Sequence, residues 1–159
     1  METIMQTLTR IAFATLVATA ATASVAAAAQ SGSTIQLRGT VAVNCSVSVT
    51  DLNQALNISG GETNKQVGTV TETCNRGNGY KITVGSANAG KLVSGAAGTS
   101  PIMYTTIYDG QSGNAGSLEI LRSQAQFNKV SSVNVTIPAS AQYIAGDYAD
   151  TLTITIAAR

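Results

Sequence analysis

The stretch Ser33–Val49 reads STIQLRGTVAVNCSVSV and alternates between apolar and mostly polar residues along its whole length. Because successive side chains of an extended chain point to opposite faces, this period of two predicts a β-strand with one apolar face. At roughly 3.3 Å per residue the run would span on the order of 50 Å, whereas an ordinary strand covers about 17–20 Å. We therefore interpret its second half, around Cys45, as the first strand of a domain and its first half as an arm for another molecule.

The first 29 residues are expected to be a secretory signal that is removed from the mature protein. A polar stretch ends at Arg10, an apolar run follows from Ile11, and Ala27–Ala29 supply the small residues that a signal peptidase needs. A transmembrane anchor is the alternative, but the run is rich in Ala and Thr and ends in a cleavage pattern. Residues 30–43 then form the arm, and residues 44–159 form one domain with its own core.

Charged residues make up 11% of the chain, and the net charge is +1. Since the few Lys and Arg residues are scattered, the sequence has no electrostatic footprint for nucleic acid. The chain has no His, which excludes Ser/His/Asp and Cys/His catalysis and any His-ligated zinc site. Asp147 and Asp150 flank a turn, where we expect solvated acids rather than a catalytic pair. We therefore expect no enzyme activity, no metal and no cofactor.

After the arm, turn residues recur about every 8 to 12 positions without a helical period, which is typical of an antiparallel β-sandwich or barrel. A turn at residues 75–79 is expected to close a hairpin between Cys74 and the strand that starts at Tyr80. A loop is expected at residues 111–117, and a loop or a minor edge strand at Leu92 and Val93. The other expected strands are a brief one at residues 56–58, then 67–74, 102–108, 118–121, 130–137, and a final one with Leu152, Ile154 and Ile156 on one face.

Cys45 and Cys74 are the only cysteines, and an even count in an exported protein predicts a disulfide between them. A redox or metal site is the alternative, but the sequence has neither a CxxC spacing nor a histidine. Closing a loop of about 30 residues should contribute roughly 3–4 kcal/mol on the chain-entropy model.

Three features in this order resemble the subunits of chaperone-usher pili (fimbriae). The arm pattern Ile35-x-Leu37-x-Gly39-x-Val41 precedes Cys45, the second cysteine lies in TETCNRGNGYKITVGSANAGKL (residues 71–92), and AGDYADT (residues 145–151) leads into the final strand. The closing pattern is also similar to spore coat U-like secreted proteins. Because the chain ends in Ala157-Ala158-Arg159, without the penultimate tyrosine of the best-known pilus class, the resemblance is at least as close to an archaic or spore coat U-like subclass.

The resemblance implies an incomplete immunoglobulin-like antiparallel β-sandwich that lacks its seventh strand. It implies that the arm is a donor strand, with Ile35, Leu37, Gly39, Val41 and Val43 filling the core of a neighbouring subunit. It also implies that the final strand lines the acceptor groove with Leu152, Ile154 and Ile156.

The function implied is that of a structural subunit of a bacterial surface pilus, which polymerises by donor-strand exchange for adhesion or biofilm formation. The implied partners are neighbouring pilus subunits, a periplasmic chaperone and an outer-membrane usher, and the implied route is export through the periplasm to the cell surface. Two alternatives remain open at this point, which are a spore coat U-like secreted matrix protein and an adhesive module that binds sugars through its tyrosines.

Overall fold

The computed structural model describes residues 31–114 and 118–159, so the predicted secretory signal lies outside the described residues. The chain divides into two units, residues 1–39 and residues 40–159. In the first unit, the described residues 31–39 form neither helix nor strand, and their side chains are exposed. All the strands of the described chain lie in the second unit.

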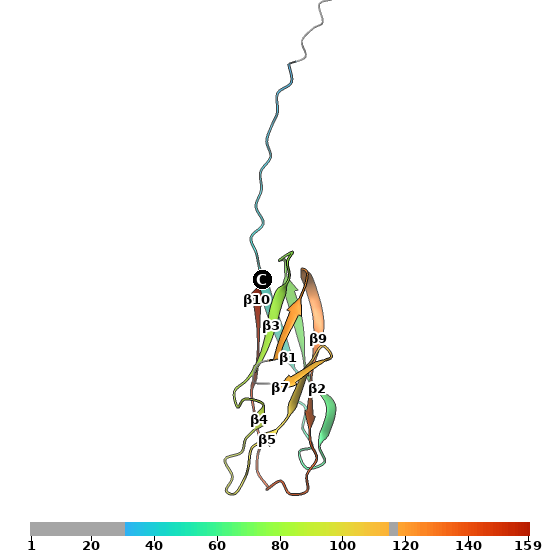
Figure 1. Cartoon of the computed structure of the whole chain (residues 1–159), viewed down its shortest axis with the longest axis vertical. Helices are drawn as coiled ribbons and strands as arrows, with labels where there is room; N and C mark the ends of the chain where they lie inside the picture. Colours follow the sequence, from blue (N-terminus) through green and yellow to red (C-terminus); the bar gives the residue numbers. More distant parts are fainter. Residues whose placement is uncertain (1–30, 115–117) are drawn as a thin grey trace, which may run out of the picture. The chain divides into compact units, whose positions relative to one another are not determined.

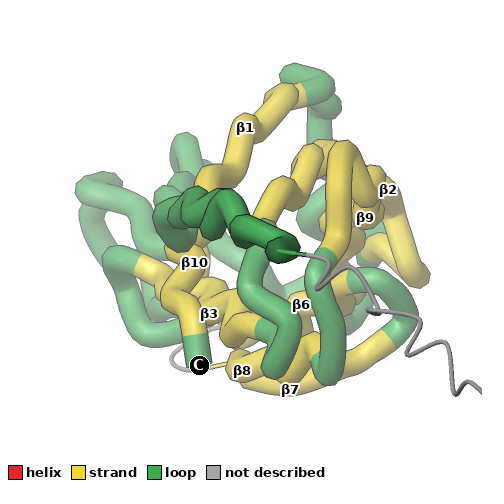
Figure 2. Tube along the Cα trace, turned by 90° about the horizontal axis from the view of Figure 1, so that it is seen from above, coloured by secondary structure: helices red, strands yellow, loops and turns green. Residues whose placement is uncertain are grey.

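The second unit is an antiparallel β-sandwich, which confirms the predicted all-β fold class (Figure 1). Seen from above, β1, β2, β9, β6 and β7 belong to one layer, and β10, β3 and β8 belong to the other (Figure 2). A small two-stranded sheet joins β4 to β5. The strands are β1 (Cys45–Asp51), β2 (Glu62–Cys74), β3 (Tyr80–Ser86), β4 (Lys91–Leu92), β5 (Ile102–Met103), β6 (Thr105–Tyr108), β7 (Gln111–Asn114), β8 (Leu118–Arg122), β9 (Gln126–Ile137) and β10 (Leu152–Ala158).

The core follows the period of two that the sequence predicts. On β3, Tyr80, Ile82 and Val84 are fully buried, whereas the residues between them are partly exposed. On β9, the predicted inward residues Val133, Val135 and Ile137 are likewise buried. Alternate residues of both layers therefore fill the space between the sheets, which is how a β-sandwich forms one core.

The predicted hairpin between Cys74 and Tyr80–Val84 is wrong. β2 pairs with β1 and β9, so neither of its edges is free, and β3 instead pairs with β10 and β8 in the other sheet. The loop Asn75–Gly79 carries the chain across the sandwich. Gly79 has a φ of +85°, and a Cβ atom there would lie 1.9 Å from the main-chain oxygen of Arg122, so the crossing requires glycine at this position.

Three other local predictions are wrong. Residues 102–108 form two strands in different sheets, because the amide of Tyr104 bonds Gly90 O at 3.1 Å and the chain changes sheets there. Residues 111–114 are strand β7 rather than loop, since Asp109 and Gly110, both with positive φ, form a two-residue turn that returns the chain beside β6. Residues 56–58 form no strand, and Asn57 Oδ1 instead accepts the Gly60 amide in a turn.

Candidate functional site

A groove of about 610 Å³ opens between β1, at the edge of one sheet, and β10, at the edge of the other. Its floor is apolar and is formed by β2 and β9, which supply Val67, Val133 and Val135. One part of its lining is polar and comes from the segment after β1 and the residues before β10. The lining residues are Val49, Asp51, Asn53, Gln54, Ala55, Leu56, Val67, Gly68, Leu92, Tyr104, Val133, Val135, Ile137, Asp150, Thr151, Leu152 and Ile154.

The inward side chains beside the groove are incompletely covered. Leu152, Ile154 and Ile156 of β10 face the core but are only partly buried, in contrast to the fully buried inward residues of the neighbouring β3. Val49 of β1 is 51% exposed. Leu152 and Ile154 line the groove as the sequence places them, whereas Ile156 is not among the lining residues and packs against the core. Each edge strand has a neighbour on one side only, so the row between them lacks a cover.

The main chain of β10 is also unpaired on the groove side. The Ala87 amide donates to Thr151 O at 3.0 Å and the Arg159 amide donates to Gly79 O at 3.2 Å, which fixes the alternation of the ladder between β10 and β3. In an antiparallel ladder every second residue points its N–H and C=O away from the partner strand. On β10 those residues are Leu152, Ile154, Ile156 and Ala158.

The same argument applies to β1. The Leu52 amide donates to Val67 O at 3.0 Å and the Asn75 amide donates to Asn44 O at 3.1 Å, so the even-numbered residues of β1 pair with β2. The odd-numbered residues, Cys45, Val47, Val49 and Asp51, point their main-chain groups away from β2. The groove therefore offers apolar side chains and two unpaired strand edges, which is the chemistry that binds an extended peptide.

Asp150, at the polar part of the groove, is not the solvated acid that the sequence suggests. Its carboxylate accepts hydrogen bonds from the hydroxyls of Ser86 and Tyr104 and from the Asn88 amide. Burial raises the pKa of Asp150, but the hydrogen bonds outweigh it and hold the pKa below its usual value. Asp150 therefore joins the start of β10 to β3 and to the segment between β5 and β6.

A buried carboxylate that the sequence analysis missed joins the two sheets away from the groove. Glu72 of β2 is fully buried and accepts hydrogen bonds from the hydroxyls of Tyr80 (2.6 Å), Tyr108 (2.8 Å) and Ser131 (2.6 Å). Arg122 of β8 binds both carboxylate oxygens, through Nε at 3.0 Å and Nη2 at 2.8 Å. Tyr80 and Arg122 come from one sheet and the others from the second, so the network connects both layers of the sandwich.

The surroundings of Glu72 decide its protonation state. Burial raises the pKa of Glu72, but the hydrogen bonds from Arg122, Ser131, Tyr80 and Tyr108 together lower it to about 2. Burial, followed by the bond to Glu72, raises the pKa of both tyrosines above their usual value. Glu72 is therefore ionised at neutral pH. None of the five residues lines the groove, so the network is a structural connection between the sheets.

We expect the stability of the protein to fall as the pH drops from about 4.5 to about 2. The native state holds the pKa of Glu72 near 2, whereas 4.5 is its usual value, so the stabilisation is complete above pH 4.5 and is lost as Glu72 protonates. The loss should reach about 3 kcal/mol for this group. Urea unfolding at several pH values would measure it, and in Glu72→Gln the fall should be smaller by that amount. An equal fall in both proteins would contradict this role.

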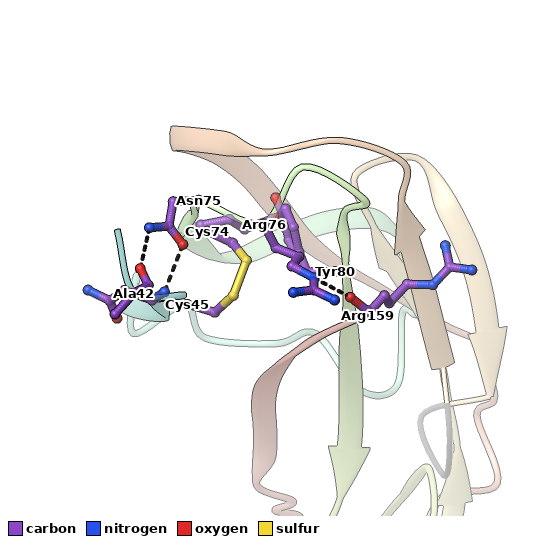
Figure 3. Close-up of a disulfide and its surroundings, with 9 residues drawn as sticks. Ala42, Cys45, Cys74, Asn75, Arg76, Tyr80 and Arg159 are labelled. Carbon is purple, nitrogen blue, oxygen red and sulfur yellow. Dashed lines mark hydrogen bonds between the residues drawn. A yellow bond between two sulfur atoms is a disulfide. The ribbon is translucent and has the colours of Figure 1, made fainter. Parts of the chain in front are cut away.

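The loop after β2 holds the segment that leads into β1 (Figure 3). The disulfide Cys45–Cys74 joins the first residue of β1 to the last residue of β2, as the sequence predicts. Next to it, Asn75 Oδ1 accepts the Asn44 amide at 2.7 Å, and Asn75 Nδ2 donates to Ala42 O at 2.8 Å.

The predicted donor-strand residues are divided between the two units. Ile35, Leu37 and Gly39 lie in the first unit, and Val41 and Val43 lie in the second. The exposed fraction of the side chain is 89% for Ile35, 91% for Leu37 and 87% for Val41, and Val43 is half exposed. The predicted roles of these residues in a neighbouring subunit remain predictions.

Comparison with known proteins gives one distant structural similarity. No protein-family model matches the sequence, and no curated protein matches it. The chain is similar to the minor tip subunit HdaB of the Escherichia coli Hda pilus, with 10% sequence identity and a TM-score of 0.40. The match covers 70% of this chain and 79% of the pilus subunit.

Two further searches concern metals and membranes. Within residues 31–114 and 118–159, no group of three or more Cys, Asp or Glu side chains is placed to hold a metal ion. The same part of the chain contains no helix of the length and hydrophobicity needed to cross a bilayer.

Proposed function

We propose that this protein is a structural subunit of a bacterial surface pilus, which polymerises when the arm of one copy fills the groove of the next. One observation carries the proposal, which is that a single chain contains both halves of such a joint. The groove has an apolar floor between two unpaired strand edges, and residues 35–43 are an exposed segment with the period of two that such a groove accommodates.

The arm and the groove match in length and pattern. β10 extends over Leu152–Ala158, and the odd-numbered residues from Ile35 to Val43 provide an apolar face of comparable length. Burying Ile35, Leu37, Val41 and Val43 at roughly 1.5–3 kcal/mol each would contribute about 6–12 kcal/mol, before main-chain pairing is counted. Gly39 lets the inserted chain approach a neighbouring backbone where a side chain would not fit.

Polymerisation follows from the symmetry of the joint. The arm and the groove are different surfaces, so head-to-tail insertion does not close and produces a fibre. Before assembly, an open groove with two free strand edges is an aggregation hazard. This hazard supports the proposal, made from the sequence resemblance, that a periplasmic chaperone covers the groove and that an outer-membrane usher receives the subunit. The disulfide is consistent with export, since such bonds persist in oxidising compartments.

The sugar-binding alternative has less support. Of the five tyrosines, Tyr80, Tyr104 and Tyr108 are buried, and their hydroxyls bind Glu72 or Asp150. These three rings are therefore not available as a surface on which a sugar could stack.

Paired substitutions in the arm test the proposal. Leu37→Asp should abolish fibres, because it would bring an unpaired carboxylate into the filled groove of the neighbour. Gln36→Asp is the matched control, since an even-numbered residue would face outward, and its fibres should remain. Electron microscopy of surface fibres and size-exclusion chromatography of the purified protein would measure both. Normal fibres in Leu37→Asp, or an equal loss in both variants, would contradict the proposal.

A further inference from the structure

We propose that the side chain of Asn75 is a positioning residue for the arm, which keeps residues 42–44 extended in continuation of β1 and so sets the face that the arm presents. The inference rests on the proposed function, because it concerns how one subunit is oriented on the next. It assigns a role to a residue of the loop between the sheets, which takes no part in the groove.

The geometry around Asn75 resembles one more step of a β-ladder. β2 ends at Cys74 because the chain then crosses to the other sheet, and the last main-chain bond of the ladder is the one from the Asn75 amide to Asn44 O at 3.1 Å. Beyond it, the Asn75 side chain accepts the Asn44 amide and donates to Ala42 O (Figure 3). In an extended chain the C=O of one residue and the N–H two residues later point to the same side. The side-chain amide therefore replaces the peptide group of the strand residue that is missing.

The orientation of the amide group is fixed by its partners. The Asn44 N–H can only donate and the Ala42 C=O can only accept, so oxygen must face Asn44 and nitrogen must face Ala42. Aspartate at this position would keep the acceptor but would lack the donor. This difference separates the two hydrogen bonds experimentally.

Packing does not hold this segment, since the side chains of residues 40–44 are all exposed. The anchor itself is well fixed. Asn75 follows the buried Cys74, whose disulfide reaches Cys45, and precedes Arg76, whose Nε donates to Arg159 O at 2.6 Å. The segment is thus attached to a part of the domain that is cross-linked on both sides.

An extended conformation at residues 42–44 has a direct consequence for the arm. Side chains alternate without interruption from β1 through these residues, so Val43 and Val41 lie on the same face as the inward Cys45 and Val47. The face of the arm that enters the neighbour is then related to the face that β1 presents to its own core. A flexible segment here would lose this relation and leave consecutive subunits free to rotate.

Hydrogen exchange of the full mature chain tests the anchor, measured in a Leu37→Asp background so that the protein stays monomeric. Asn75→Ala should increase the exchange rate of the Asn44 amide roughly tenfold, the effect of losing one hydrogen bond. Asn75→Asp should leave that amide protected and lower only the NMR order parameters of residues 41–43. Asn78→Ala, an exposed residue of the same loop, should change neither. Unchanged exchange and order in Asn75→Ala would overturn the inference.

The fibres provide the second measurement. With a wild-type arm, Asn75→Ala should still polymerise, because arm and groove are intact, but the persistence length of its fibres should be at least about twofold shorter than that of Asn78→Ala fibres. Equally stiff fibres would overturn the part of the inference that concerns subunit orientation. If the wild-type protein formed no fibres, the proposed function would fail, and the exchange result alone would still support or overturn the anchor.

Discussion

Replacing Glu72 by alanine should lower the free energy of unfolding by about 3–5 kcal/mol, which is the cost of removing one partner from a buried ion pair. The substitution leaves the Arg122 guanidinium, which is 12% exposed, without its bidentate partner, and leaves the hydroxyls of Tyr80, Tyr108 and Ser131 without their acceptor. Since small domains are stable by only about 5–15 kcal/mol, such a loss would be a large part of the total. Urea unfolding followed by circular dichroism would measure it.

The chain offers a matched control on its surface. Glu119 forms an ion pair with Lys81 at 2.6 Å, but its side chain is 49% exposed. Glu119→Ala should therefore cost less than about 1 kcal/mol. If Glu72→Ala does not fold, Glu72→Gln provides the measurement, because it keeps the shape and loses the charge, and it should still cost more than Glu119→Ala. Equal costs at positions 72 and 119 would show that the network contributes little.

A charge inside the groove should reduce polymerisation on the order of a hundredfold. Val49 is half exposed on the groove side of β1, so Val49→Asp should leave the monomer folded. Filling the groove would then bury an unpaired carboxylate, which costs several kcal/mol. Ser48→Asp is the control, because Ser48 is exposed on the opposite face of the same strand, and its fibres should remain. Fibre yield per folded monomer is the quantity to compare, with the thermal melt reporting the folded state.

Mixing two defective variants tests the head-to-tail joint itself. Leu37→Asp has an intact groove and a defective arm, whereas Val49→Asp has an intact arm and a defective groove. Neither should polymerise alone, but the mixture should give a dimer with one copy of each, which cannot grow further. Analytical ultracentrifugation would detect this species. Absence of a mixed dimer, with both proteins folded, would contradict insertion of one arm into one groove.

The local pattern of residues predicted most of the strands. The alternation in residues 67–74, 80–84 and 130–137 appears as β2, β3 and β9, with the expected residues inside the sandwich. The errors arose where the identity of the neighbouring strand mattered. A turn between two strands suggested a hairpin, but β2 already has neighbours on both sides, so the chain had to cross to the other sheet.

The site could be predicted only in part. A carboxylate at an inward position of β2, between Val70 and Cys74, was a signal in the sequence that could have revealed the buried network. Its partners are 8 to 59 residues away along the chain, so no spacing identifies them. The role of Asn75 was equally hidden, because asparagine in a turn is common and its contact with Ala42 depends on how two strands end.

The sequence by itself determined the all-β class, the inward face of the main strands, the disulfide and the apolar face of the arm, because each depends on the alternation of side chains along one segment or on counting cysteines. Only the tertiary structure decided which strands lie side by side, that β1 and β10 leave an uncovered row between them, and that Glu72 connects the sheets. The physical reason is that a period of two specifies which side of a strand is buried, whereas hydrogen bonding between distant segments specifies which strand lies beside it.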